Sequence, residues 1–97
     1  MLVGPWCAMR GAREALRALE DASGIPVVGM ESPRGVADPA LGAFAEVLAQ
    51  ADRVLLIGKR VDFTLRFGAA FAPTCEFHQV DPEPSEIERT RGALERA

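Results

Sequence analysis

The feature that most constrains the fold is a regular alternation of short apolar runs with amphipathic stretches along the 97 residues. The clearest run, residues 53–58 (RVLLIG), is continuously apolar after Arg53, which is typical of a strand covered on both faces in a parallel sheet. Residues 12–22 instead place alanine and leucine at the i, i+3, i+4, i+7 spacing of one helical face. The alternation predicts an α/β fold.

The predicted elements follow one another as strand and helix throughout the chain. We expect strands at residues 2–5, 25–30, 53–58 and 75–81, and helices at 12–22, 39–51, within 59–71, and from 85 onward. Asp38 followed by Pro39 is a strong helix start and predicts Asp38 as N-cap. Such alternation predicts a Rossmann-like three-layer sandwich with a parallel sheet, right-handed crossovers and strand order 2-1-3-4.

Composition excludes several classes of function. The net charge is -3, and basic residues alternate with acidic ones, so we expect no nucleic-acid partner. No segment approaches the roughly 20 apolar residues that a membrane span needs. Two separated cysteines and one histidine are too few for a zinc site, so no metal is expected. Cys7 and Cys75 allow a disulfide, but two free, buried thiols in a cytoplasmic protein are favoured.

The extent of the chain also supports a prediction. The sequence begins within a predicted strand and ends before the fifth strand that a doubly wound sheet would normally have. We therefore expect residues 1–97 to form a single domain that is part of a larger protein.

The candidate site lies where the strand order reverses, because open α/β sheets bind ligands beyond the carboxyl ends of their strands. In this sheet the reversal falls between the first and third strands. The residues placed near it are Gly4 after the first strand, Arg34 after the second, Gly58, Lys59, Arg60 and Asp62 after the third, and Asp81 at the end of the fourth.

These residue types suit a nucleotide. Lys59, Arg60 and Arg34 could meet phosphates, with an arginine holding them in bidentate fashion, and Asp81 could accept from ribose hydroxyls. Alternatively, the cations are solvated loop charges and Asp81 caps a turn before Pro82. The GxGxxG and GxxxxGK[ST] motifs are absent, which disfavours ordinary dinucleotide dehydrogenases and P-loop proteins.

Other conspicuous side chains are interpreted as structural. His78 lies in a predicted strand with no acidic partner in view, which favours a packed or surface histidine. Phe63, Phe67 and Phe71 recur every four residues, which favours a core stripe over a binding surface. No catalytic residue is predicted.

The order of motifs resembles the central domain of thiamine-diphosphate-dependent enzymes. The stretches that carry the resemblance are 24–28 (GIPVV), 34–35 (RG), 51–63 (ADRVLLIGKRVDF), 67–68 (FG) and 79–82 (QVDP). They resemble the branch that contains acetolactate synthase, benzaldehyde lyase, and 2-hydroxyacyl-CoA lyase or oxalyl-CoA decarboxylase. The resemblance covers nearly the whole chain.

The resemblance implies that the full protein is a lyase or transferase with three domains. This chain would be its middle domain, which is not catalytic by itself. Flanking pyrimidine-binding and diphosphate-binding domains would be its partners, in a homo-oligomer such as a dimer. These flanking domains would hold thiamine diphosphate and Mg. They would do so through the family's cofactor-activating glutamate and a Gly-Asp-Gly … Asn segment, neither of which appears in this sequence.

Central domains of the family bind FAD, the ADP part of coenzyme A, or nothing. The matching positions are Gly4, Arg34, Arg60, Asp62 and Asp81. The turn after the first strand and the short segment between Arg34 and the second helix depart from flavin-binding members, which argues against FAD. Two alternatives remain: a purely structural domain, and a stand-alone nucleotide-binding or dimerisation module without thiamine chemistry.

Overall fold

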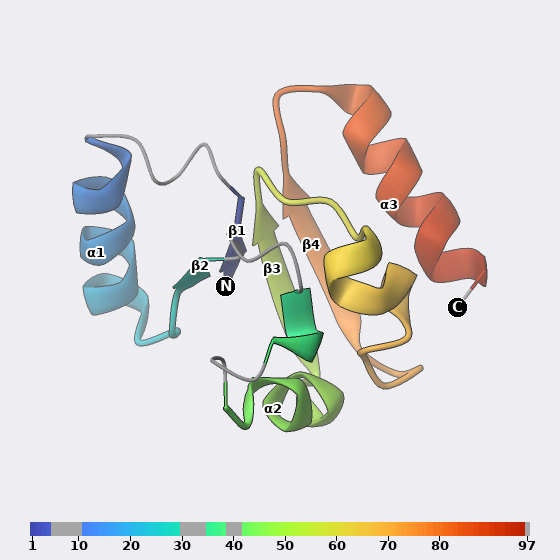
Figure 1. The fold of residues 1–97 in the computed structure, drawn as a ribbon. Coiled ribbons are helices and arrows are strands. Elements are labelled where there is room, and N and C mark those ends of the chain that lie inside the picture. The colour runs from blue at the N-terminus through green and yellow to red at the C-terminus, as the bar shows by residue number, and fades with distance from the viewer. Residues whose placement is uncertain (5–10, 30–34, 39–41, 97) are drawn as a thin grey trace.

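A four-stranded sheet organises the protein, here a computed structural model that describes residues 1–4, 11–29, 35–38 and 42–96. Its strands are β1 (Leu2–Val3), β2 (Val28–Gly29), β3 (Arg53–Ile57) and β4 (Glu76–Val80). All neighbours are parallel, in the order β2-β1-β3-β4, so the predicted fold class and strand order are confirmed (Figure 1).

The strand register brings the carboxyl ends of three strands together. β3 and β4 pair along their whole length, from Arg53 opposite Glu76 to Ile57 opposite Val80. β1 pairs over two residues on each side, and its Val3 lies opposite Ile57 of β3. The loops that follow β1, β3 and β4 therefore start from one edge of the sheet.

Helices and 3₁₀ turns connect the strands. They are α1 (Ala12–Ser23), η2 (Gly35–Ala37), α2 (Phe44–Gln50), η4 (Phe63–Gly68) and α3 (Pro84–Arg96). The first helix ends as predicted, because Gly24 adopts the left-handed conformation and its N–H bonds to Glu20 O at 2.9 Å. None of the described helices combines the length and the apolar character needed to cross a bilayer.

Helix α2 begins later than the helix predicted from residue 39. It starts at Phe44, and its N-cap is Ala43 rather than the expected Asp38. Residues 39–41, which would form the first turn after Asp38, lie outside the described residues. Asp38 donates its backbone N–H to Gly35 O at 3.1 Å and closes the turn η2. Gly42, with a positive φ of 60°, separates that turn from the helix.

The hydrophobic core lies against one face of the sheet. Burial alternates along β3, where Val54 and Leu56 are buried while Leu55 and Ile57 are only partly covered, so its apolar run does not mean two equally covered faces. Leu56 of β3 and Leu65 of η4 are fully buried. The core cluster consists of Leu2, Val36, Leu48, Val54, Leu56, Val61, Leu65, Phe71 and Ala93.

Two amphipathic stripes expected from the sequence are not buried. Helix α1 lies at the β2 side of the molecule, and none of its residues is buried (Figure 1). In the predicted phenylalanine stripe only Phe71 is buried, and it packs edge to face on Phe77 with the ring centres 4.8 Å apart. Phe63 and Phe67 are exposed, so the prediction of a core stripe is wrong for these two residues.

Candidate functional site

Two glycines allow the ends of β1 and β3 to approach each other at the carboxyl edge of the sheet. Gly4 donates its N–H to Ile57 O at 3.1 Å, and Gly58 donates to Val80 O at 2.9 Å. A Cβ atom on Gly4 would stand 2.0 Å from Gly58 O, which no side chain tolerates. The predicted switch point is therefore a place of close backbone contact where only glycine fits.

Beside these glycines lies a cavity of about 490 Å³ between the loops after β3 and β4 and the start of α3. Its lining residues are Ile57, Gly58, Lys59, Arg60, Asp62, Val80, Asp81, Pro82, Glu83 and Glu86. Five of the seven residues expected at the site are in this list, and Gly4 contacts the same wall through Gly58. Arg34 lies outside the described residues.

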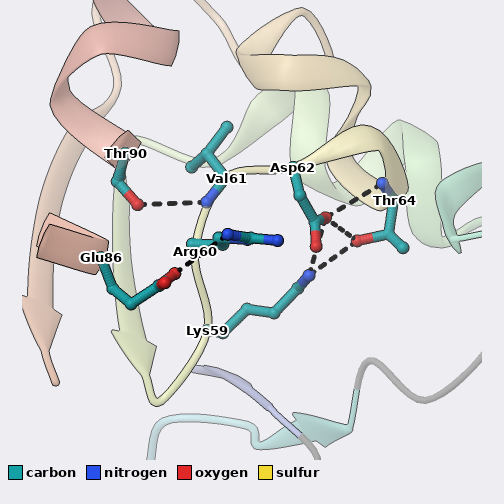
Figure 2. Close-up of polar contacts among 7 residues, drawn as sticks. All are labelled: Lys59, Arg60, Val61, Asp62, Thr64, Glu86 and Thr90. Atoms are coloured by element: carbon teal, nitrogen blue, oxygen red, sulfur yellow. Dashed lines mark hydrogen bonds and ion pairs between the residues drawn. The ribbon is translucent and has the colours of Figure 1, made fainter. Parts of the chain in front are cut away.

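The ammonium group of Lys59 is held inside the protein. Lys59 is 5% exposed, and its Nζ donates to Asp62 Oδ1 at 2.8 Å and to Thr64 Oγ1 at 2.7 Å (Figure 2). Asp62 Oδ1 also accepts the backbone N–H of Thr64 at 3.0 Å and the Thr64 hydroxyl. Because its charge is already paired with Asp62, the main role of Lys59 is to hold the start of η4 in place through Asp62 and Thr64.

Competing effects set the pKa of Asp62. Burial alone would raise this pKa, but hydrogen bonds from Lys59 and Thr64, together with the positive charge of Lys59, outweigh burial and lower it. Asp62 is thus a carboxylate at neutral pH and the fixed anionic partner of Lys59.

Arg60 is the accessible cation among the described residues that line the cavity. Its side chain is 41% exposed, and Nη1 lies 3.4 Å from Glu86 Oε2 on α3 (Figure 2). Glu86 also faces Arg89, at 3.5 Å from its Oε1. The loop carrying Arg60 is fixed on its other side, because Val61 donates its N–H to Thr90 Oγ1 at 3.2 Å. The backbone at Arg60 is therefore held in place, while the Arg60 side chain makes only a long ion pair with Glu86.

Asp81 adopts the turn-capping geometry that the sequence left open as an alternative. Its Oδ1 accepts the backbone N–H of Glu83 at 3.0 Å, across Pro82. Within the described residues Oδ2 of Asp81 has no hydrogen-bond partner, so one carboxylate oxygen remains for a further donor. Capping and ligand binding are therefore compatible at this residue.

Sequence reasoning did not find the acidic side chains that line the cavity at the start of α3. Glu83 and Glu86 line the cavity, and Glu86 meets Arg60 across 26 positions of sequence. No local motif announces such a long-range pair. Thr90, which fixes the loop, is 29 positions from its partner Val61 and carries no local signal either.

The described side chains that line the cavity offer both hydrogen-bond donors and acceptors to a ligand. No group of three or more His, Cys, Asp or Glu side chains that could hold a metal ion occurs in the described part of the chain. Cys75 lies away from this cavity, near Phe71 and Leu94, and burial raises the pKa of its thiol. The cavity offers a guanidinium, several carboxylates and a glycine-lined backbone.

Comparison with known proteins gives one family and two relatives. The family model described as "Thiamine pyrophosphate enzyme, central domain" matches residues 1–95. Oxalyl-CoA decarboxylase of Escherichia coli K12 is 32% identical over 97 residues, which covers 94% of this chain and 17% of that enzyme. The oxalyl-CoA decarboxylase of Escherichia coli O157:H7 matches to the same extent. The chain therefore spans about a sixth of the length of these relatives.

Proposed function

The chain belongs to the family of thiamine pyrophosphate enzyme central domains, and on this premise we propose that its carboxyl-edge cavity binds the ADP part of coenzyme A. It would do so as the middle, non-catalytic domain of a thiamine-dependent acyl-CoA decarboxylase or carboligase. Both relatives are named for a reaction on a CoA ester, which favours CoA over the other nucleotides.

The observation that carries the proposal is the pairing of an accessible guanidinium with strand-end carboxylates in one cavity. Arg60 would contact phosphate oxygens, which arginine binds in bidentate fashion. Asp81 would accept from ribose hydroxyls, as strand-end acids do in related sheets. The approach of Gly4 to Gly58 leaves backbone instead of side chains at the wall, so a ligand can come close.

Lys59 has a different role in this proposal from the one its position suggests. Its ammonium is committed to Asp62 and Thr64, so it holds the loop that presents Arg60. Glu86 competes with phosphate for Arg60, because the two acceptors would use the same donor. Binding therefore requires exchange of the Glu86 carboxylate for phosphate, and we expect modest affinity.

A flavin is a poorer fit than ADP. A cavity of about 490 Å³ is in the usual range for a single small ligand. The sequence also has Gly4-Pro5-Trp6 where flavin-binding members have a glycine-rich turn. FAD binding is therefore kept as an outcome of the test.

Thiamine diphosphate is not assigned to this cavity. In the family its Mg–diphosphate unit is held by a Gly-Asp-Gly … Asn segment. The Gly-Asp-Gly segment is absent from the sequence. In this proposal the cofactor and its chemistry belong to flanking domains.

Calorimetric titration of the 97-residue chain with ADP, CoA, FAD and thiamine diphosphate tests the proposal. We expect saturable binding of ADP and CoA, weakened about tenfold or more by Arg60→Ala because a charge-assisted contact is lost. Asp81→Asn should weaken both ligands as well. Arg53→Ala is the matched control, since Arg53 is an exposed arginine at the opposite end of β3.

Two results would contradict this proposal. The first is no heat of binding for ADP or CoA at millimolar concentration. The second is binding that Arg60→Ala and Arg53→Ala weaken equally, because the ligand would then lie elsewhere. Tighter binding of FAD than of CoA would keep the cavity as a nucleotide site and change the ligand.

A further inference from the structure

Glu86 is a cavity carboxylate that two arginines contact at the same time. Its Oε2 lies 3.4 Å from Arg60 Nη1, as Figure 2 shows, and its Oε1 lies 3.5 Å from Arg89 Nη1. The Glu86 side chain is 27% exposed, whereas those of Arg60 and Arg89 are 41% and 64% exposed. Glu86 is thus the less accessible partner in both ion pairs, and the arginines contact different oxygens of its carboxylate.

The two arginines lie differently with respect to the cavity. Arg60, on the loop after β3, belongs to the described lining of the carboxyl-edge cavity, and Arg89 does not. Arg89 follows Glu86 by three positions on α3 and lines a neighbouring hollow beside Phe63 and Ala93. A ligand in the carboxyl-edge cavity can therefore reach Arg60 while Arg89 remains paired with Glu86.

A hydrogen bond holds together the two backbone segments that carry these arginines. Val61, directly after Arg60, donates its N–H to Oγ1 of Thr90 at 3.2 Å, and Thr90 directly follows Arg89. Thr90 is 4% exposed, so this contact lies inside the protein. An exchange of partners at Glu86 therefore needs only side-chain rotation, with the loop and α3 kept in place relative to each other.

The arrival of a phosphate leaves the charge of Glu86 in need of a partner. A phosphate that takes the Arg60 guanidinium brings further negative charge close to Glu86, and like charges at short range repel each other. A carboxylate that loses its counter-ion in a partly buried position is also unfavourable. Arg89 offsets both effects, because it stays paired with the second oxygen of Glu86.

We propose that Glu86 and Arg89 together set the affinity of the carboxyl-edge cavity for phosphate-bearing ligands. Glu86 holds Arg60 while the cavity has no ligand, and Arg89 retains Glu86 after a phosphate has taken Arg60. Arg89 is a positioning residue, because it acts through Glu86 and does not touch the ligand. This inference rests on the function proposed above and adds to it the residues that regulate the same site.

Calorimetric titration of the 97-residue chain with ADP at low ionic strength tests the inference. Glu86→Gln should tighten ADP binding about three- to fivefold, because Arg60 is then free of a competing carboxylate. Arg89→Gln should weaken binding about twofold, because Glu86 then pairs with Arg60 alone. The double variant should bind like Glu86→Gln, since Arg89 has no effect of its own once residue 86 is uncharged.

A second ion pair on α3 supplies matched controls. Glu88 and Arg91 have the same spacing, approach to 3.0 Å and are exposed, and neither belongs to the described lining of the cavity. Glu88→Gln and Arg91→Gln remove the same charges from the same helix. They should change ADP affinity by less than about 1.5-fold, because solvent screens exposed charges that do not reach the cavity. Circular dichroism checks that each variant keeps its helices.

Three results would overturn this inference. They are an ADP affinity that Glu86→Gln leaves unchanged or weakens, an Arg89→Gln variant that binds ADP as tightly as the wild type or tighter, and a loss from Arg89→Gln that persists in the double variant. Changes of the same size in the Glu88 and Arg91 variants would also overturn it, because the net charge of α3 would then explain them.

Arg60→Ala separates this inference from the proposed function. If Arg60→Ala weakens ADP binding and Glu86→Gln does not strengthen it, only the inference fails. If Arg60→Ala has no effect on ADP affinity, or if the wild type does not bind ADP, the proposed function fails and the inference fails with it.

Discussion

The two ends of the sheet are built very differently. Residues 53–96, from β3 to α3, pair two full strands, bury Leu56 and Leu65 completely and enclose the cavity at the carboxyl edge of the sheet. Residues 12–29, with α1 and β2, contribute no residue to the buried core cluster, and β2 pairs with β1 over two residues. The first of these regions carries most of the core cluster and the candidate site, while the second lies beside them.

This contrast shows that regular secondary structure and stability are separate properties. Helix α1 has a sequence with clear apolar periodicity and a well-formed glycine C-cap, yet Leu19 on its apolar face remains 39% exposed. η4 is irregular, yet it supplies the fully buried Leu65 and the Thr64 hydroxyl that accepts a hydrogen bond from Lys59. We therefore expect substitutions in η4 to affect the whole domain and those in α1 to act locally.

The largest expected effect is the loss of the Leu65 side chain. Leu65→Ala should lower the free energy of unfolding by about 2–5 kcal/mol, because it leaves a cavity in the only core that touches η4 among the described residues. Leu19→Ala in α1 should cost less than about 1 kcal/mol, since that side chain is exposed and alanine favours a helix.

Urea denaturation followed by circular dichroism measures both variants. If Leu65→Ala does not fold, Leu65→Met retains most of the volume and should fold with a loss below about 1.5 kcal/mol. Equal losses for Leu65→Ala and Leu19→Ala would mean that α1 packs as firmly as η4, and the contrast between the regions would be lost.

A second comparison uses one glycine that packs against η4 and one that ends helix α1. Gly35 and Gly24 both have positive φ, at 58° and 72°, so alanine is strained at both. At Gly35 the new Cβ would also stand 2.2 Å from Thr64 O, whereas at Gly24 nothing lies within 4 Å. Gly24→Ala should therefore cost about 1 kcal/mol, from conformation alone, and Gly35→Ala about 2–4 kcal/mol.

Thermal unfolding of both variants separates the two contributions. The shared left-handed conformation cancels in the comparison, so the difference reports the contact between η2 and η4. Similar melting temperatures for the two variants would show that η2 can move away from Thr64 at little cost.

How much of this could be predicted from the sequence depends on how local the determinant is. The sheet order follows from apolar runs and from the rule that crossovers are right-handed, and the end of α1 follows from Gly24. The phenylalanine stripe failed because it assumed a regular helix. Two left-handed residues, which cost roughly 1–2 kcal/mol each, turn Phe67 outward instead.

The same local rules indicated which residues lie around the cavity. They did not predict the hydrogen bonds and ion pairs among those residues. Strand ends place Gly58, Arg60 and Asp81 around one cavity, as expected from where a parallel sheet binds ligands. The commitment of Lys59 to Thr64 depends on how η4 folds back, and the pairing of Arg60 with Glu86 depends on where α3 starts. Those are tertiary facts with no signature in the neighbouring residues.

The smallest of the expected effects concerns the ion pair between Lys59 and Asp62 and how the free energy of unfolding changes at acidic pH. The pKa of Asp62 is lowered in the folded protein, so its carboxylate stabilises the fold above its ordinary pKa of about 3.9. That contribution is lost as pH falls through the lower, folded value. At neutral pH Asp62→Asn should cost about 1–2 kcal/mol, a modest figure because the Asp62 side chain is 21% exposed.

Urea denaturation between pH 7 and pH 2.5 should show the two proteins converging below about pH 4, since protonation removes from the wild type what the substitution has already removed. Asp21→Asn on the exposed helix α1 controls for the loss of one carboxylate and should retain the acid-induced loss of the wild type. A gap between wild type and Asp62→Asn that stays constant down to pH 2.5 would mean that the charge of Asp62 does not hold Lys59. The stability of η4 would then come from the packing of Leu65 alone.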